Sequence, residues 1–294
     1  MGVLNVDKPS GWTSHDVVAK IRRIIGQRRV GHAGTLDPMA TGVLVVCLGK
    51  ATRLVEYLAD LRKAYRATVH LGVETDTWDA EGSVVAREDA SYVTLEQIES
   101  VLGRFRGEIQ QIPPMYSALK QEGRPLYRLA RQGITVEREP RPVHVYRLDV
   151  VEWDPPRLSL DLVCSKGTYV RSLAHDLGQA LESGAHLAEL SRRAVGHFTL
   201  ENAVPLDALI HASSVQPYLL SARAALKHLP GVQVDAEQAN RLAHGQDIAL
   251  SAAPQAWDIC CAYDADQELV AILRPDASGQ RWRPAKVFVD PSQK

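Results

Sequence analysis

The sequence lacks the features that mark a membrane-spanning or exported protein. No stretch of its 294 residues approaches the roughly 20 uninterrupted apolar positions that a membrane helix needs. The opening residues, MGVLNVDK, lack the basic-then-apolar layout of a signal peptide. We therefore expect a cytoplasmic protein without membrane contact.

Cysteine is scarce, and its spacing does not suit a metal site or disulfides. Four cysteines occur, and none belongs to a CxxC pair. Cys47 and Cys164 lie in apolar runs, whereas Cys260 and Cys261 are adjacent. This spacing disfavours a zinc site and a disulfide framework, so we expect buried thiols.

Net charge is nearly absent, at −1, but it is unevenly distributed. A neutral total alone disfavours a nucleic-acid ligand, because phosphate neutralisation supplies most of the affinity for such ligands. Residues 1–72 nevertheless carry a net charge of +6, residues 73–101 of −7 and residues 102–147 of +5. Two basic segments form a polyanion-binding face if folding brings them together, although ordinary solvated surfaces fit the same pattern.

The order of predicted elements indicates a mixed sheet in an α+β or α/β domain. The expected strands are 3–6, 43–48, 65–72, 143–151 and 158–164, and the expected helices are 14–25, 52–61, 94–105 and 169–181, followed by a helical stretch at about 205–228. Segment 106–142 is basic and rich in proline, which is typical of an insertion that reaches over a ligand. Short β-like runs follow residue 229, so we expect a domain 1–228 and a small β-rich domain 229–294.

The run GHAGTLDPMATG at 31–42 is the strongest candidate for a chemical site, with Asp37 at its centre. Its three glycines and one proline predict a tight loop with a fixed backbone. Covalent catalysis at a sugar carbon or an electrophilic ring carbon requires a carboxylate held at attack distance and left unprotonated. The commoner role of an Asp-Pro pair, capping a turn, stays open.

A second run, SKGTYVRSLAHDLG at 165–178, follows an apolar strand and opens a helix. Tyr169 and Arg171 fall at the start of that helix, where a ligand can approach. The run is not a Walker A loop, since its first glycine is missing and its lysine precedes Gly167. Arg171 can form an ion pair with a carboxylate such as Asp37. Ion pairs of this kind occur both in active sites and as structural contacts, so both roles stay open.

Tyr65 and His32 each allow a functional and a structural interpretation. Tyr65 begins a strand among basic residues, where its ring can stack on a base, although a core tyrosine fits the same position. His32 and Asp37 supply two possible metal ligands, but no third lies nearby in the sequence, so we expect no metal.

Five ordered segments over about residues 3–200 resemble the TruB family of tRNA pseudouridine-55 synthases. They are NVDKPSGWTSHDVV, GHAGTLDPMATGVLVVCLGKATR, KAYRATVHLGVETDTWDAEG, QIPPMYSALKQEGRPLYRLARQG and CSKGTYVRSLAHDLG, and the second contains the family's G-H-x-G-x-L-D-P-x-A-x-G core. The resemblance implies an α+β fold: a mixed-sheet catalytic domain with an RNA-gripping insertion at about 106–142, and a C-terminal PUA-like β-barrel domain that binds RNA.

The resemblance also implies a reaction and its residues. Uridine 55 of the tRNA TΨC loop would become pseudouridine by breakage of N1–C1′ and formation of C5–C1′, in a monomer without cofactor or metal. Asp37 resembles the catalytic nucleophile, Arg171 the arginine paired with it, and Tyr65 the tyrosine that packs on the target base. The positions that match substrate-binding residues are His32, Tyr169, Leu190, Lys8 and Asp79.

Three alternatives stay open at this point. The chain could be a noncatalytic RNA-binding protein or tRNA-folding chaperone, but the presence of Asp37, Tyr65 and Arg171 speaks against lost activity. It could be a metal-dependent hydrolase that uses His32 and Asp37. It could also be a sister synthase that acts on a guide-directed or different RNA.

Overall fold

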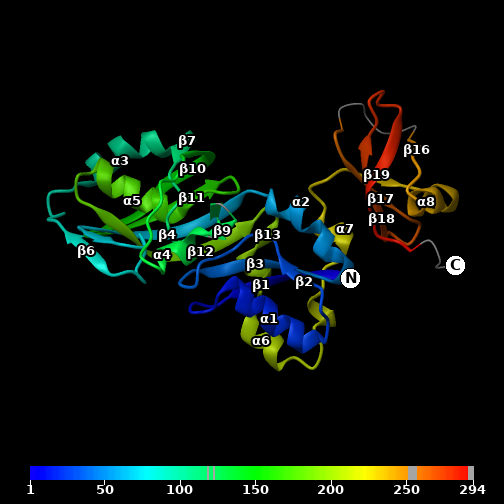
Figure 1. The fold of residues 1–294 in the computed structure, drawn as a ribbon, viewed down its shortest axis with the longest axis horizontal. Coiled ribbons are helices and arrows are strands. Elements are labelled where there is room, and N and C mark those ends of the chain that lie inside the picture. The colour runs from blue at the N-terminus through cyan, green and yellow to red at the C-terminus, as the bar shows by residue number, and fades with distance from the viewer. Residues whose placement is uncertain (118, 122, 251–256, 291–294) are drawn as a thin grey trace.

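The largest sheet of the protein is mixed and has ten strands (Figure 1). The structure, a computed structural model, describes residues 1–117, 119–121, 123–250 and 257–290. The strand order is β14-β1-β3-β12-β4-β11-β10-β7, while β2 pairs with β3 and β13 pairs with β12. The strands are β1 (Gly2–Lys8), β2 (Val30–His32), β3 (Thr41–Leu48), β4 (Lys63–Leu71), β7 (Gly107–Gln111), β10 (Arg141–Asp154), β11 (Arg157–Cys164), β12 (Ala185–Val195), β13 (Phe198–Thr199) and β14 (Val204–Pro205).

The sequence pattern does not predict β12, which lies at the centre of this sheet. β12 pairs in parallel with β3 and antiparallel with β4, so it joins the two halves of the sheet. Its sequence, AHLAELSRRAV, has charged residues among apolar ones, and its register against β4 shifts twice. Such irregularities interrupt the alternation by which a strand is recognised from sequence.

Helices cover the two halves of the sheet with separate apolar clusters. The helices are α1 (Ser14–Ile25), α2 (Val55–Ala59), α3 (Leu95–Leu102), α5 (Val170–Ala180) and α6 (Leu206–His211). α3 and α5 pack together on β4, β10 and β11, whereas α1 and α6 pack on β1 and β3 (Figure 1). α1 begins where its sequence predicts, because Thr13 and Asp16 form a capping box.

The structure adds detail to three segments of the sequence-based prediction. The helical stretch expected at 205–228 is a series of short helices and turns, including α7 (Ala222–Ala225), rather than one continuous helix, since Ser213, Ser214 and Pro217 favour turns. The acidic segment forms a hairpin of β5 (Val73–Thr75) and β6 (Val84–Arg87). Segment 106–142 contributes β7 and the start of β10 to the main sheet. The excursion itself therefore spans 112–140 and contains β8 (Lys120–Gln121), β9 (Arg124–Pro125) and α4 (Leu126–Ala130).

The C-terminal residues form a second, five-stranded sheet of order β15-β17-β18-β19-β16. Its elements are β15 (Gly231–Gln233), α8 (Ala236–Ala243), β16 (Ile248–Ala249), β17 (Cys260–Tyr263), β18 (Leu269–Pro275) and β19 (Arg281–Val287). Residues 251–256 and 291–294 of the expected C-terminal domain lie outside the described residues. One face of this sheet shares an apolar cluster with β3 and α2, through Tyr263, Ile272 and Phe288.

Two expectations from composition can be compared with the structure. All four cysteines are buried and free, as predicted. Among the described residues, no helix combines the length and the apolar character needed to span a membrane.

Candidate active site

Asp37 lies on a loop between β2 and β3, residues 33–40, which we call the Asp37 loop. Its backbone is held from several elements. Ser14, at the start of α1, donates from its hydroxyl to the carbonyl of Leu36 (3.0 Å) and accepts from the Leu36 N–H (2.8 Å). The Gly11 N–H donates to the Pro38 carbonyl at 2.9 Å. Satisfied backbone groups of this kind fix a loop that has no regular secondary structure.

Two buried cationic side chains, Lys8 and Arg192, also hydrogen-bond to the backbone of the Asp37 loop. Lys8, with 0% of its surface exposed, donates from Nζ to the carbonyls of Pro9 (2.9 Å), Trp12 (2.7 Å) and Pro38 (3.1 Å). Arg192, on β12, donates to the carbonyls of Gly34, Thr35 and Val43. Burial lowers the pKa of Lys8 to about 8, against the attraction of Asp37.

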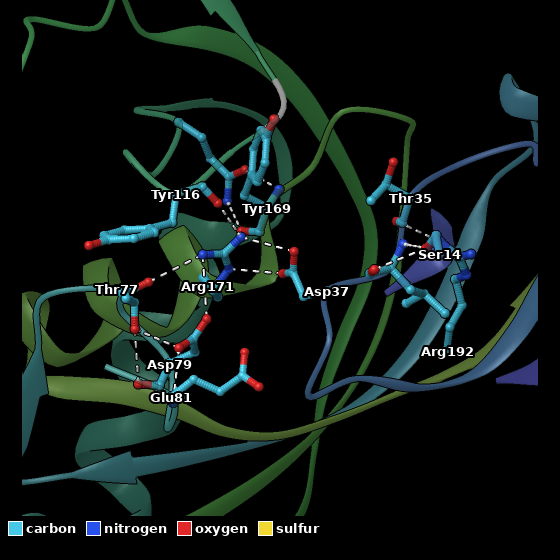
Figure 2. A network of polar contacts seen from close by, with 12 residues as sticks. Ser14, Thr35, Asp37, Thr77, Asp79, Glu81, Tyr116, Tyr169, Arg171 and Arg192 are labelled. Carbon is cyan, nitrogen blue, oxygen red and sulfur yellow. Dashed lines mark hydrogen bonds and ion pairs between the residues drawn. The ribbon is translucent and has the colours of Figure 1, made fainter. Parts of the chain in front are cut away.

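The Asp37 carboxylate meets a guanidinium from α5. Arg171 Nη2 donates to Asp37 Oδ1 at 3.0 Å, and Arg171 Nε lies 2.9 Å from Asp37 Oδ2 (Figure 2). The Arg171 side chain is 4% exposed, whereas that of Asp37 is 31% exposed. One partner is thus fixed inside the protein, and the carboxylate keeps an open side where a substrate can approach.

Arg171 also joins the site to the insertion and to the acidic hairpin. Its Nη2 donates to the Tyr116 carbonyl at 2.8 Å, and its Nη1 lies 3.4 Å from both the Thr77 carbonyl and an Asp79 carboxylate oxygen (Figure 2). The Thr77 hydroxyl (2.5 Å) and the Glu81 N–H (3.1 Å) donate to the other Asp79 oxygen. Asp79 is therefore a buried partner of Arg171 rather than an exposed charge.

Opposing forces act on the protonation of Asp37. Burial raises its pKa, the charge of Arg171 lowers it, and the nearby carboxylate of Asp79 raises it again. Glu81 has a raised pKa for similar reasons, namely burial and the charges of Asp79 and Asp37. The guanidinium of Arg171 is thus the main group that favours an ionised Asp37.

Apolar side chains from three elements lie together beside the loop. Tyr65 on β4 and Leu190 on β12 belong to one buried cluster with Leu36 and Ala40 of the Asp37 loop. Burial raises the pKa of the Tyr65 hydroxyl, and the charge of Arg192 opposes this rise. The cluster places buried apolar surface beside the Asp37 loop.

Tyr169 lies immediately before α5, where β7 holds its backbone. The Gln111 amide accepts from the Tyr169 N–H (3.0 Å) and donates to the Tyr169 carbonyl (3.2 Å). Burial raises the pKa of the Tyr169 hydroxyl, and a hydrogen bond with Ser117 lowers it. Gln111 thus joins the start of the insertion to the first turn of α5.

His32 ends β2, at the entrance to the Asp37 loop. Its ring meets the ring of His15 edge-on, with centroids 5.9 Å apart. Burial lowers its pKa to about 4, helped by the charges of His15 and Arg192, so the ring is neutral at pH 7. Within the described part of the chain, no group of three or more His, Cys, Asp or Glu side chains is placed to hold a metal ion.

Sequence reasoning missed three residues that organise the site: Ser14, Gln111 and Arg192. Each bonds mainly to backbone groups of a residue far away in the chain, for example 22 positions away for Ser14 and 158 for Arg192. Arg192 in particular lies in the unpredicted strand β12. A local pattern carries no signal of such partners.

Comparison with known proteins identifies the class of this site. Residues 22–170 match the family described as TruB family pseudouridylate synthase (N terminal domain), and residues 171–227 match the tRNA pseudouridylate synthase B C-terminal domain. A tRNA pseudouridine synthase B of Dehalococcoides mccartyi is 48% identical over 100% of this chain and 98% of its own length. One of Ralstonia nicotianae is 45% identical over 95% of this chain and 90% of its own.

Solved structures show the same architecture. A chain in a structure of an H/ACA RNP bound to a substrate RNA containing 2′-deoxyuridine superimposes with a TM-score of 0.75 at 29% identity, over 99% of this chain and 86% of that one. A chain of a Cbf5–Nop10–Gar1 complex gives a TM-score of 0.75 at 30% identity, over 99% and 85%. The expected α+β fold, a mixed catalytic sheet with a small C-terminal β domain, is confirmed.

The fold and these matches define a pseudouridylate synthase, an enzyme of the isomerase class. More narrowly, the chain belongs to the TruB family.

Proposed function

We propose that this chain isomerises uridine 55 in the TΨC loop of tRNA to pseudouridine, with Asp37 as the nucleophile. The observation that carries the proposal is the pairing of a partly exposed Asp37 carboxylate with the buried Arg171 guanidinium. The substrate is inferred from relatives of nearly equal length that are named tRNA pseudouridine synthase B.

The chemistry needs little beyond an anion in a dry pocket. The N1–C1′ bond breaks, the uracil turns, and a C5–C1′ bond forms before the C5 proton leaves, so no redox change occurs. Asp37 can attack C1′ or C6, or can remove a ribose proton to form a glycal. In each case Arg171 orients the carboxylate and favours its ionised form.

The surrounding residues then have distinct roles. The ring of Tyr65 packs on the target base, with Leu190 of the same cluster beside it, and Tyr65 or a water accepts the C5 proton. Tyr169 and His32 contact the flipped nucleotide and its neighbours. The Asp79 carboxylate holds the Arg171 guanidinium in place through their ion pair.

Lys8 is expected from the sequence among the substrate-binding residues, but its burial favours a supporting role. Its three hydrogen bonds to backbone carbonyls use all three N–H donors of the ammonium group. We infer that Lys8 positions the Asp37 loop and acts on the substrate only through that loop.

Basic residues of the insertion grip the RNA outside the pocket. The insertion presents the exposed side chains of Arg124, Arg128 and Arg131, and flipping a base out of its stack costs a few kcal/mol that such contacts can offset. We assign residues 1–228 to the catalytic domain and 229–294 to a PUA-like RNA-binding domain, in a cytoplasmic monomer that needs no cofactor.

The substitution Asp37→Asn in the purified protein tests the nucleophile. With tRNA transcript carrying tritium at uridine C5, the wild type should release tritium from position 55, and Asp37→Asn should reduce release by about 10⁴-fold or more, since no other group can replace a covalent nucleophile. Binding of tRNA should stay within about threefold of wild type, because the substitution keeps the shape of the side chain.

An exposed carboxylate provides the matched control. Asp149 is 52% exposed on the outer face of β10, and Asp149→Asn should retain wild-type release. Release by Asp37→Asn at a near wild-type rate would refute the nucleophile assignment. A wild-type protein that binds tRNA without releasing tritium would instead support a noncatalytic chaperone, and activity lost to a chelator would support a metal-dependent enzyme.

A further inference from the structure

Arg192 is a second buried arginine at the Asp37 loop, in addition to Arg171. Arg192 is 1% exposed and donates to the carbonyls of Val43 (2.7 Å, from Nε), Thr35 (3.3 Å, from Nη1) and Gly34 (3.0 Å, from Nη2). Figure 2 shows Arg171 and Arg192 on opposite sides of Asp37. Arg171 contacts two carboxylates, whereas no ion pair formed among the described residues includes Arg192.

Holding a loop does not by itself require a charge at this place. Ser14 holds the neighbouring Leu36 from both its N–H and its carbonyl with an uncharged hydroxyl. A buried guanidinium loses its hydration, and carbonyl dipoles compensate for this only in part when no anion is adjacent. The protein therefore keeps a costly positive charge where neutral donors could make comparable contacts.

The positive charge of Arg192 lies next to the residues that would bind the target base. Arg192 on β12 is directly paired with Tyr65 on β4, and side chains at paired positions project from the same face of a sheet. Leu190, which shares the buried cluster of Tyr65, is two residues earlier on the same strand. The charge of Arg192 also opposes the rise in the pKa of Tyr65 and contributes to the lowered pKa of His32, so its field reaches both residues.

We propose that Arg192 assists the isomerisation electrostatically: its charge, fixed beside Tyr65, stabilises the negative charge that the uracil carries once it has left the sugar. The inference rests on the proposed function. When N1–C1′ breaks, its electron pair stays on the uracil; the turned base then bonds to C1′ through C5, and the C5 proton passes to a base. A preorganised charge that needs no reorientation is an effective stabiliser of such a transient anion.

Two substitutions separate the charge of Arg192 from its hydrogen bonds. Arg192→Lys keeps the charge but loses the planar fork, whereas Arg192→Gln keeps a neutral donor and loses the charge. The readout is the single-turnover rate of tritium release at saturating tRNA, with tRNA affinity measured separately. We expect Arg192→Gln to be about 100-fold slower than wild type and Arg192→Lys to recover at least about tenfold of that loss, with affinities within about threefold.

The neighbouring Arg193 provides the control, because it is exposed and follows Arg192 on the same strand. Arg193→Gln should keep the wild-type rate. If Arg192→Gln does not fold, as judged by thermal unfolding, Arg192→Met serves as the neutral variant. A rate for Arg192→Lys equal to or below that of the neutral variant would overturn the proposal, whereas an inactive wild type would contradict the proposed function instead.

Discussion

Polar side chains, three of them buried, determine where the Asp37 carboxylate lies. Every carbonyl from Gly34 to Met39 accepts a hydrogen bond, from donors on Arg192, Ser14, Lys8 and Ser10 or on the loop's own backbone. A stretch in which every carbonyl is hydrogen-bonded has few alternative conformations at low energy. The carboxylate is thus preorganised for attack rather than recruited by the substrate.

Removal of the Ser14 hydroxyl tests this preorganisation. Ser14→Ala leaves the buried N–H and carbonyl of Leu36 without their partner, so the free energy of unfolding should fall by about 1–3 kcal/mol. Turnover should fall as well, because the residue next to Asp37 loses its anchor. Urea unfolding together with the tritium-release assay measures both quantities, and an unchanged rate in a destabilised protein would show that the anchor does not position Asp37.

Single buried residues also make the stability of the fold depend on pH, and His197 is an example. Its ring stacks on Phe198 with centroids 4.3 Å apart, and its buried Nε2 has no hydrogen-bond partner among the described residues. Burial, together with the charges of Lys227 and His228, lowers its pKa to about 4. Between pH 6.5 and pH 4 the unfolded chain therefore binds a proton that the folded protein does not, and stability is lost as the pH falls.

His197→Phe should remove this contribution while keeping an aromatic ring on Phe198. Between about pH 7 and pH 5 the wild type should lose about 1–2 kcal/mol more unfolding free energy than the variant. Urea denaturation at the two pH values gives the comparison. The same loss in both proteins would mean that other groups cause the acid sensitivity.

Asp37 and Arg171 can be found from sequence because glycine-rich and strand-to-helix motifs surround them. Ser14 and Arg192 cannot, although they fix the same loop. Their partners are peptide carbonyls, which every residue has, so only the folded chain reveals which carbonyl lies nearby. The sequence therefore indicates the reacting groups better than the groups that hold them.

Among the elements, the insertion 112–140 is anchored at both ends beside the active site. At its start, Gln111 pairs with Tyr169. At its end, Arg138 donates to the Pro113 carbonyl at 3.0 Å and lies over Trp78, whose ring stacks on that of His175. Between these anchors the side chains of Arg124, Arg128 and Arg131 are exposed, as is suitable for contact with phosphates.

Charge reversal in the insertion should weaken tRNA binding more than it slows the isomerisation of bound tRNA. The triple variant Arg124→Glu, Arg128→Glu, Arg131→Glu should raise the tRNA dissociation constant by about tenfold or more and reduce the salt slope of binding by about 2–3, in proportion to the number of phosphates that these arginines neutralise. The rate at saturating tRNA should change little. Filter binding at several salt concentrations measures the slope, with the exposed Arg104→Glu outside the insertion as the control. An unaltered slope would exclude the insertion from the RNA interface.

Element prediction fails where tertiary context overrides local pattern. Strand β12 lies between β3 on one side and β4 on the other, yet two register shifts break its alternation. The segment 205–228 has helical composition, but Pro217 and the two serines before it divide it into short turns. Elements with clear caps or regular spacing, such as α1 and α5, are predicted to within a residue or two.

For the whole molecule, the net charge of −1 is a sum over segments with opposite roles. The basic segments 1–72 and 102–147 supply the Asp37 loop and the insertion, and the acidic segment between them supplies Asp79 as a partner for Arg171. A neutral total therefore coexists with strongly basic segments. The distribution of charge, rather than its sum, indicates the ligand.

The shared apolar cluster should make the two sheets unfold as one cooperative unit. Phe288 is 4% exposed, packs in the cluster that includes β3 and α2, and lies under the guanidinium of Arg53. Phe288→Ala should lower the unfolding free energy by about 3–5 kcal/mol and keep a single unfolding transition. Calorimetry tests this, with the exposed Val85→Ala as a control. Two separate transitions in the wild type would contradict the shared core.

Pseudouridine mapping across total RNA tests the central claim most directly. A strain that lacks the gene for this chain is complemented with the wild type or with Asp37→Asn. We predict that pseudouridine is absent at position 55 of tRNA in the deletion strain, returns with the wild type, and does not return with Asp37→Asn. Position 55 still modified in the deletion strain, or loss confined to a different RNA, would contradict the account.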